Sequence, residues 1–217
     1  MKQIDFNILK KRLPQSPELI DKEEYFVSSV LIPFVKIDSI NCLLFEKRSA
    51  NIRQGGEISF PGGEFNKEID KTLQGAAVRE TIEELGINRE KINVIGQLGV
   101  HIIPGVVVNA FVANIGIGNI EEINFDKTEV EKVFAVPVSF FIENPPEVYR
   151  INLEAHPYYI DEKGKRVDLL PVEKLKLPSR YSKPWGRYKR KVYFYNYDGE
   201  VIWGITAALV KKVVELL

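Results

Sequence analysis

The chain has 217 residues, 45% hydrophobic and 28% charged, which is enough for one core of good size. Thirty Lys and Arg residues balance thirty Asp and Glu residues, so the net charge of zero creates no overall field that attracts nucleic acid or an acidic membrane. One cysteine excludes an internal disulfide, and two histidines argue against a histidine-based zinc centre. A hard metal ion held by oxygen ligands is not excluded.

The chain carries no signal that directs it to a membrane. No stretch approaches the roughly 20 uncharged apolar residues that span a bilayer, and Met1 to Phe6 lack the apolar region of a signal peptide. We therefore expect a cytoplasmic protein with no membrane partner. We expect a single domain over residues 1–217, with its core from about residue 26 and a short N-terminal helical extension over 1–25. The sequence leaves the oligomeric state open, a homodimer included.

Strands dominate the first third of the chain. Runs rich in Val, Ile, Leu and Phe separated by turn residues predict them. The elements expected there are a short helix over 6–12 and strands over 26–36, 40–48 and 58–60. From residue 71 to residue 85 similar positions recur every three or four residues, and Gly86 follows as a stop signal. This is the clearest predicted helix.

The rest of the chain mixes strands and helices. The elements expected there are strands over 92–103, 106–115, 149–160 and 191–197 and helices over 139–142 and 203–217. Because the order shows no strict βαβ repeat, it predicts an α+β fold, an α/β/α sandwich with a mixed β-sheet between helices. A basic stretch over 174–191, interleaved with Tyr and Trp, is the one shift in composition.

Three glutamates on the clearest helix point to chemistry. Glu80, Glu83 and Glu84 stand at positions i, i+3 and i+4, which places their carboxylates on one face. Like charges at this spacing destabilise a helix by roughly 0.2–0.5 kcal/mol, a cost that a divalent cation reverses. Oxygen-only ligation favours Mg²⁺ or Mn²⁺. Arg79 reaches Glu83 one turn on and can hold its carboxylate in one orientation. A solvated helix surface is the alternative interpretation.

Two glycines precede this helix. Gly62 and Gly63 follow directly after a predicted strand, and their lack of a side chain lets the backbone come close to a bound group. A carbonyl in this loop is a further candidate metal ligand. A bare turn is the alternative interpretation.

The segment from Gly62 to Ile87 resembles the Nudix box, in which a glycine and then a glutamate precede Arg-Glu-x-x-Glu-Glu-x-Gly and an apolar residue. The loop before the helix is about two or three residues longer than the common form. Glu68 lies six residues after Gly62, but Lys71 stands eight residues before Arg79. We therefore assign no role to Glu68.

The flanking residues are similar to the coenzyme A pyrophosphatase branch of that family, in which this loop is also long. The similarity covers roughly residues 26–217 and rests on Arg48, Arg53, Phe60-Pro61-Gly62-Gly63, and the segments 109–112, 129–137 and 202–207. The chain departs from the signature in having Glu57 where glutamine is usual and Glu46 where threonine is common. One residue is also missing between Arg53 and Phe60.

The resemblance implies a Nudix fold and hydrolysis of a pyrophosphate bond, dependent on Mg²⁺ or Mn²⁺, in a nucleotide-derived small molecule. By position, Glu80 and Glu84 would be the main metal ligands, and Glu83 would join or orient them. The catalytic candidates are Arg79, Glu83 and Glu131, with Glu129 as a further candidate for the general base. The substrate-binding candidates are Arg48, Arg53, Gly62 and Gly63.

For coenzyme A, the products implied by the resemblance are 4'-phosphopantetheine and adenosine 3',5'-bisphosphate. Its 3'-phosphate needs cations, which Arg48, Arg53 or the basic stretch could supply. RNA binding or a solvated loop are the alternatives for that stretch. Hydrolysis of ADP-ribose, dinucleotides or damaged nucleoside triphosphates is the alternative within the family. A non-catalytic nucleotide-binding module is the alternative from another class.

Overall fold

The structure is a computed structural model that describes residues 5–15 and 19–217. Residues 1–4 and 16–18 of the expected N-terminal extension lie outside the described residues. The helices are α1 (Phe6–Arg12), α2 (Leu73–Leu85), α3 (Val138–Glu143) and α4 (Gly204–Val214). The strands are β1 (Phe26–Ile37), β2 (Ile40–Arg48), β3 (Ile58–Ser59), β4 (Gly62–Glu64), β5 (Ile92–Ile103), β6 (Val106–Ile115), β7 (Val130–Pro137), β8 (Glu147–Ala155), β9 (Tyr158–Ile160), β10 (Arg166–Asp168), β11 (Trp185–Tyr197) and β12 (Glu200–Trp203). Short 3-10 turns cover Lys22–Glu24, Arg89–Lys91, Ile120–Glu122 and Ser179–Ser182.

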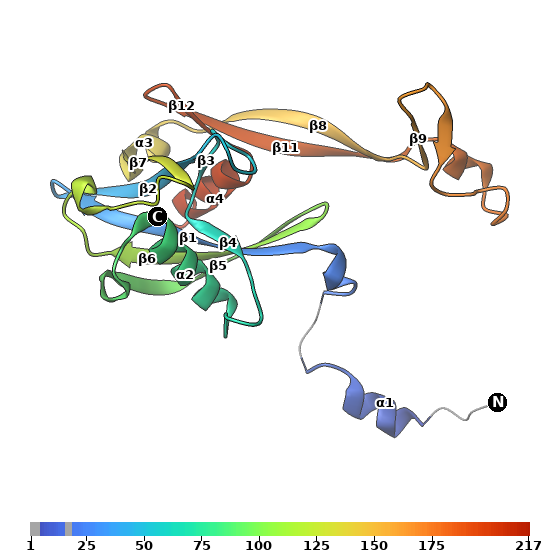
Figure 1. Cartoon of the computed structure of the whole chain (residues 1–217), viewed down its shortest axis with the longest axis horizontal. Coiled ribbons are helices and arrows are strands. Elements are labelled where there is room, and N and C mark those ends of the chain that lie inside the picture. The colour runs from blue at the N-terminus through green and yellow to red at the C-terminus, as the bar shows by residue number, and fades with distance from the viewer. Residues whose placement is uncertain (1–4, 16–18) are drawn as a thin grey trace.

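A mixed sheet forms the centre of the body (Figure 1). In the described part of the chain it has seven strands in the order β3-β2-β1-β6-β5, with β4 paired to β1 and β7 paired to β2. The β1–β6 pair is parallel, and the other pairs of this sheet are antiparallel. A mixed sheet packed between helices confirms the predicted α+β class.

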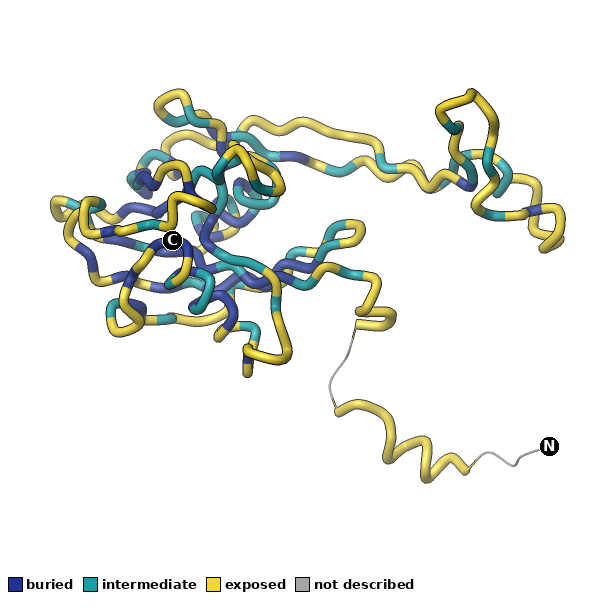
Figure 2. Tube along the Cα trace, viewed as in Figure 1, coloured by how far each residue is buried: buried dark blue, intermediate teal, exposed yellow. Residues whose placement is uncertain are grey.

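The two faces of this sheet carry two separate hydrophobic clusters. On one face, Leu31 and Phe111 pack with α2 through side chains such as Ala77 and Leu85. On the other face, Ile32 packs with α3 and α4. Alternate residues of β1 thus serve opposite faces, as the twofold side-chain period of a strand requires. Buried residues are concentrated in this body (Figure 2).

The helix α2 begins and ends at residues suited to those positions. The Thr72 hydroxyl accepts a hydrogen bond of 2.9 Å from the Gly75 N–H, which satisfies one of the free donors of the first turn. Gly86 ends the helix in the left-handed conformation, with φ of 63°. A side chain at Gly86 would also collide with the backbone carbonyl of Asn124. These contacts define both ends of the helix that carries the three glutamates.

A long ribbon of β8 and β11 leaves the body and carries the β9–β10 hairpin at its far end (Figure 1). The ribbon and α1 are largely exposed along their length (Figure 2). Strand β12 joins the ribbon to α4 and completes a three-stranded sheet with β11 and β8. Among the described helices, none has the length and apolar character needed to cross a membrane.

The predicted elements are present, although the strand expected over 149–160 is divided into β8 and β9, and four strands were missed, β4, β7, β10 and β12. Strand β11 begins at Trp185, six residues before the predicted start at 191. The charged residues at its start gave no strand signal, because a two-stranded ribbon exposes both faces and needs no alternation of apolar residues. Strand β7 carries Glu131 and Lys132 and is recognisable only through its pairing with β2. Strands β4 and β12 have three and four residues and depend on their partners.

Candidate active site

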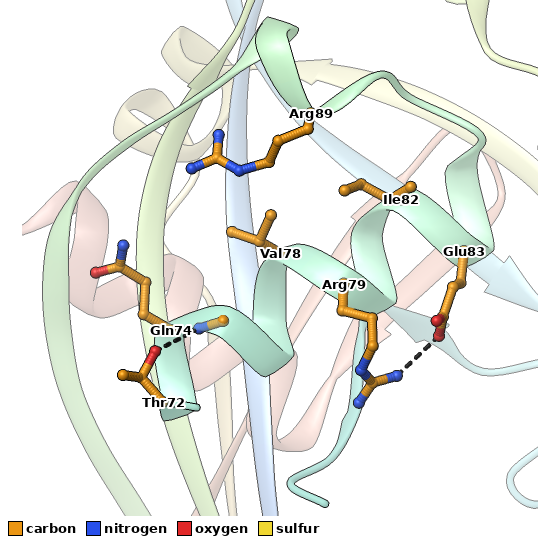
Figure 3. A pocket seen from close by; sticks show the side chains of 8 residues that line it. Thr72, Gln74, Val78, Arg79, Ile82, Glu83 and Arg89 are labelled. Carbon is orange, nitrogen blue, oxygen red and sulfur yellow. Dashed lines mark hydrogen bonds and ion pairs between the residues drawn. The ribbon is translucent and has the colours of Figure 1, made fainter. Parts of the chain in front are cut away.

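Arg79 organises one side of the glutamate face of α2. Its guanidinium donates to both Asp70 oxygens, at 2.9 and 3.0 Å. The same group donates to Glu83 Oε2 at 2.8 Å (Figure 3). It also lies 2.8 Å from Glu80 Oε1 and reaches the Glu64 carbonyl at 3.3 Å. The bond to Arg79 holds the pKa of Asp70 below its usual range. Arg79 therefore ties the long loop before α2 to two of the three glutamates.

Asp70 is a contact that the sequence did not identify. Glu68 and Asp70 are both acidic residues of the long loop, and spacing alone could not choose between them. Asp70 is buried and pairs with Arg79, whereas Glu68 is exposed. The expected link from Arg79 to Glu83 is present in the structure.

Glu80 lies against the glycine loop. The Gly63 backbone approaches so closely that a Cβ there would fall on the Glu80 carboxylate. At Gly62, with φ of 156°, a Cβ would meet the backbone of Ser29 and Val30. The two glycines are thus needed for close packing of β4 between β1 and α2.

Glu84 is buried beneath the same loop. Its side chain is 3% exposed, and Oε2 accepts a hydrogen bond of 2.8 Å from the Gly62 N–H. Arg48 Nη1 stands 3.9 Å from Oε1. Burial, and next the charge of Glu46, raise the pKa of Glu84 to about 9, so the single cation at that distance does not offset the cost of burying the charge.

Glu46 is the second buried carboxylate of this region. It is 1% exposed, and its Oε1 accepts a hydrogen bond of 3.1 Å from the Ser59 hydroxyl and lies 3.9 Å from Arg48 Nη1. Oε2 has no hydrogen-bond partner in the structure. Burial is the main cause that raises the pKa of Glu46 to about 7. The sequence signal for this residue is a glutamate at the end of the apolar run of β2.

This donor set suits a hard divalent cation. Glu46, Glu80 and Glu84 supply only oxygen atoms, and in the described part of the chain Glu46 Oε2 is buried without a hydrogen-bond partner. Arg48 lies 3.9 Å from Glu46 and from Glu84, and Arg79 lies 2.8 Å from Glu80. Among the described residues, no three acidic, histidine or cysteine side chains already form a metal-binding geometry. Glu80 and Glu83 are turned to Arg79 instead. Binding a cation here therefore requires Glu80 to exchange part of its contact with Arg79.

A pocket of about 390 Å³ opens beside the glycine loop, on the α4 face of the sheet. Arg48, Gly62 and Gly63 line it at the end near the carboxylates, so the pocket and the buried glutamates share these residues. Arg53 and Arg190 add two further cations to its wall. The remaining lining includes Gln54 and Glu57 of the loop before β3 and is otherwise mostly apolar, with residues from β1, β3, β5, β6, β8, β11, β12 and α4.

The first turn of α4 also faces this pocket. Gly204 to Thr206 line it, and Trp203 at the N-cap position accepts no side-chain capping bond from them. Free N–H groups at a helix start carry a partial positive charge. The pocket thus combines apolar walls with several positive groups, as an anionic organic molecule requires.

A second hollow, of about 340 Å³, lies on the outer side of α2 (Figure 3). Thr72, Val78, Ile82 and Arg89 are among its lining residues. It contains neither Glu80 nor Glu84, so it does not reach the buried carboxylates. The pocket beside Gly62 is the one that adjoins them.

Three further predicted residues, Glu129, Glu131 and Arg53, differ in their relation to the cluster of Glu46, Glu80 and Glu84. The negative charge of Glu129 contributes to the raised pKa of both Glu46 and Glu80, which places Glu129 close to them. Glu131 is half-exposed and pairs with Lys47 at 3.4 Å, so the structure does not bring it to the carboxylate cluster. Arg53 lies over the Phe26 ring at 5.6 Å at the pocket wall.

Known proteins of similar sequence include Nudix hydrolases. The uncharacterized Nudix hydrolase NudL of Photorhabdus laumondii is 27% identical over 213 residues, covering 96% of this chain and 94% of that protein. Two partial matches come from Mus musculus. The mitochondrial coenzyme A diphosphatase NUDT8 is 30% identical over 56% of this chain and 59% of its own length, and the peroxisomal coenzyme A diphosphatase NUDT7 is 32% identical over 56% and 50%.

Among solved structures, the Nudix hydrolase RenU from M. smegmatis has a TM-score of 0.44 at 18% identity and covers 54% of this chain and 74% of that one. The family model described as the NUDIX domain matches residues 28–147, from β1 to the start of β8. This match spans the glycine loop, all three glutamates of α2 and both Glu46 and Glu129. The chain belongs to the Nudix hydrolase family.

Proposed function

We propose that this protein hydrolyses the pyrophosphate bond of coenzyme A or its derivatives with Mg²⁺ or Mn²⁺, to give 4'-phosphopantetheine and adenosine 3',5'-bisphosphate. The observation that carries the proposal is the pair of buried carboxylates, Glu46 and Glu84, with too little positive charge around them, next to a glycine loop that opens into a cationic pocket. Nudix hydrolases in general use divalent metal ions. The similarity to NUDT7 and NUDT8 and the motifs around Arg48 and Arg53 support coenzyme A as the substrate.

Glu80 and Glu84 are the proposed main ligands of the metal, Glu83 joins or orients them, and we add Glu46 because its carboxylate is buried and its charge acts on Glu84. A bound divalent cation would neutralise pyrophosphate charge and acidify a water molecule. Arg79 holds Glu80 and Glu83 in position by its bonds to both. Arg48 lies between Glu84 and the pocket and would contact the phosphate groups, and Gly62 and Gly63 would let these groups approach the backbone.

The general base remains to be assigned among Glu83, Glu129 and Glu131. Glu83 is held by Arg79, and Glu131 is held by Lys47 outside the carboxylate cluster. Glu129 is close enough to influence Glu46 and Glu80 and pairs with no cation in the described part of the chain. We therefore favour Glu129. Changing Glu129 to Gln should lower kcat about 100-fold at unchanged metal affinity, and more than the same change at Glu131, as measured by steady-state kinetics. Small and equal losses of kcat in these two variants would indicate Glu83 as the general base instead.

Product analysis by mass spectrometry tests the substrate. The protein is incubated with Mg²⁺ or Mn²⁺ and a panel of coenzyme A, ADP-ribose, NADH and 8-oxo-dGTP. Adenosine 3',5'-bisphosphate formed from coenzyme A, with little product from the others, is the expected result. Preferred cleavage of another compound would keep pyrophosphate hydrolysis and overturn the coenzyme A assignment.

Two variants make the panel decisive. Glu84→Gln should show no turnover of any compound, whereas Glu143→Gln, which removes an exposed carboxylate at the end of α3, should match the wild type. If neither the wild type nor Glu143→Gln cleaves any compound with either metal, the chain acts as a nucleotide-binding module and the proposed hydrolysis is wrong.

A further inference from the structure

The ribbon brings one residue of the basic stretch into the wall of the pocket. Strand β11 alternates, so that Arg190 and Val192 line the pocket while Lys189 and Lys191 are exposed. Ile151, paired with Arg190 on β8, lines it as well. Of the basic side chains from Lys183 to Lys191, Arg190 is the one that faces this cavity. The rest of the stretch is solvated.

Arg190 is held over the sheet by a neutral partner. Its Nη2 lies 3.4 Å from Nε2 of His101 on β5, a contact that joins the ribbon to the body where the ribbon passes the β5–β6 hairpin (Figure 1). Among the described residues, no carboxylate forms an ion pair with Arg190. Burial and the charge of Arg190 lower the pKa of His101, so at neutral pH the imidazole is uncharged. His101 therefore does not neutralise the charge of the guanidinium, and most of the N–H donors of Arg190 can bind another group.

The register of the strands gives the distance from the glycine loop to His101, which contacts Arg190. Gly63 pairs with Ser29 on β1, Ser29 pairs with Asn109 on β6, and Asn109 pairs with Val100 on β5, beside His101. Three strand spacings of about 4.8 Å separate Gly63 from this position, a total of roughly 14 Å. An anion at Arg190 would thus lie about one nucleotide unit away from a pyrophosphate at the glycine loop. Apolar residues of β1 and β6, among them Phe26 and Val108, line the pocket between the two points.

We propose that Arg190, positioned by His101, is a specificity residue that binds a phosphate group of the substrate remote from the bond that is cleaved. On the proposed function, on which this assignment of the group rests, this is the 3'-phosphate of coenzyme A. The forked guanidinium suits a phosphate better than a lysine does, because it can donate two parallel hydrogen bonds. Arg53, which also lines the pocket, is left for other phosphate groups.

Two matched ligand pairs test this role with the full-length protein. Steady-state kinetics compare coenzyme A with 3'-dephospho-coenzyme A, and calorimetric binding compares adenosine 3',5'-bisphosphate with AMP. The variants are Arg190→Gln, Arg190→Lys and the control Lys189→Gln on the exposed side of the same strand.

The wild type and Lys189→Gln should prefer the 3'-phosphorylated member of each pair. Arg190→Gln should raise KM for coenzyme A about 10- to 100-fold with little change in kcat, and should leave the dephosphorylated compounds within about twofold. Arg190→Lys should restore part of the preference. Binding of adenosine 3',5'-bisphosphate tests Arg190 even if coenzyme A is not cleaved, which separates failure of this inference from failure of the proposed function.

Three results would overturn the assignment. The wild type would show no preference for the 3'-phosphorylated ligands, or Arg190→Gln would weaken both members of a pair equally, as loss of ribbon packing would do. The third is a Lys189→Gln variant that loses the preference as fully as Arg190→Gln, which would indicate a general charge effect.

Discussion

The two sides of the glutamate face of α2 are neutralised to different degrees. On the Arg79 side, one guanidinium contacts Asp70, Glu80 and Glu83 at 2.8–3.0 Å. On the opposite side, Glu84 and Glu46 are almost fully buried, and their shared cation Arg48 is 3.9 Å from each. The first arrangement ties the loop before α2 to the helix, and the second leaves two buried carboxyl groups whose ionised forms lack a close cation. Glu80 contacts Arg79 and is also a proposed metal ligand, so it belongs to both sides.

Removing the charge of Glu84 should have the largest effect on activity. We expect Glu84→Gln to lower kcat by about 10³-fold or more, because a principal ligand of the proposed metal is lost. The metal-free variant should be at least as stable as the wild type, since an uncompensated buried carboxylate is removed. Steady-state kinetics and thermal unfolding in EDTA measure the two quantities. An active variant would refute the ligand assignment.

Glu46→Gln is expected to have the next largest effect. The amide keeps the bond with Ser59 but removes a charge that faces Glu84, so the metal site loses part of its attraction. We expect metal affinity to fall about 10- to 100-fold and activity to recover partly at high metal concentration. Kinetics as a function of Mn²⁺ concentration measure this. Unchanged metal dependence would show that Glu46 is only a buried residue of β2.

On the Arg79 side, Asp70→Asn should affect stability more than chemistry. The loss of a bidentate ion pair that anchors the long loop should cost about 1–3 kcal/mol of the free energy of unfolding and about tenfold in kcat. Glu68→Gln, in the same loop but exposed, is the matched control and should change neither quantity. Denaturant unfolding and kinetics of both variants measure the effects. A larger loss of kcat than for Glu46→Gln would reverse the comparison of the two sides.

The last expected effect concerns the pH dependence of stability in the metal-free protein and not activity. The pKa of Glu84 is about 9 in the folded chain and 4.5 as the ordinary value. Between these two pH values the folded state holds a proton that the unfolded chain has lost, so stability should fall as pH rises through that window. The melting temperature from pH 5 to 9 should fall more steeply for the wild type than for Glu84→Gln. Parallel curves would contradict the raised pKa.

The helix, the glycine loop and the longer strands could be predicted from local patterns. The 3.6-residue period of α2, the stop at Gly86 and the alternating apolar runs are local signals, and they carry the box glutamates with them. Asp70 could not be chosen over Glu68, because the choice depends on how the loop folds against Arg79.

Long-range pairing hides the other parts of the site. Ser59 reaches Glu46 only because β2 and β3 pair there, across 13 positions of the chain. Arg190 reaches the pocket only because the ribbon folds back over His101, 89 positions earlier. Neither contact leaves a periodic signal in the sequence. The basic stretch could be noticed, but not which of its residues faces the cavity.

Calorimetric titration with Mn²⁺ at pH 7 in buffers of different ionisation enthalpy tests the central claim most directly. If the buried pair of Glu46 and Glu84 is the metal site, binding must displace protons from these carboxylates, whose pKa values are about 7 and 9. The observed heat should then depend on the buffer and show release of about one proton or more, and Glu84→Gln should bind much more weakly with less release. Buffer-independent binding that is the same in Glu84→Gln would place the metal elsewhere and contradict the account.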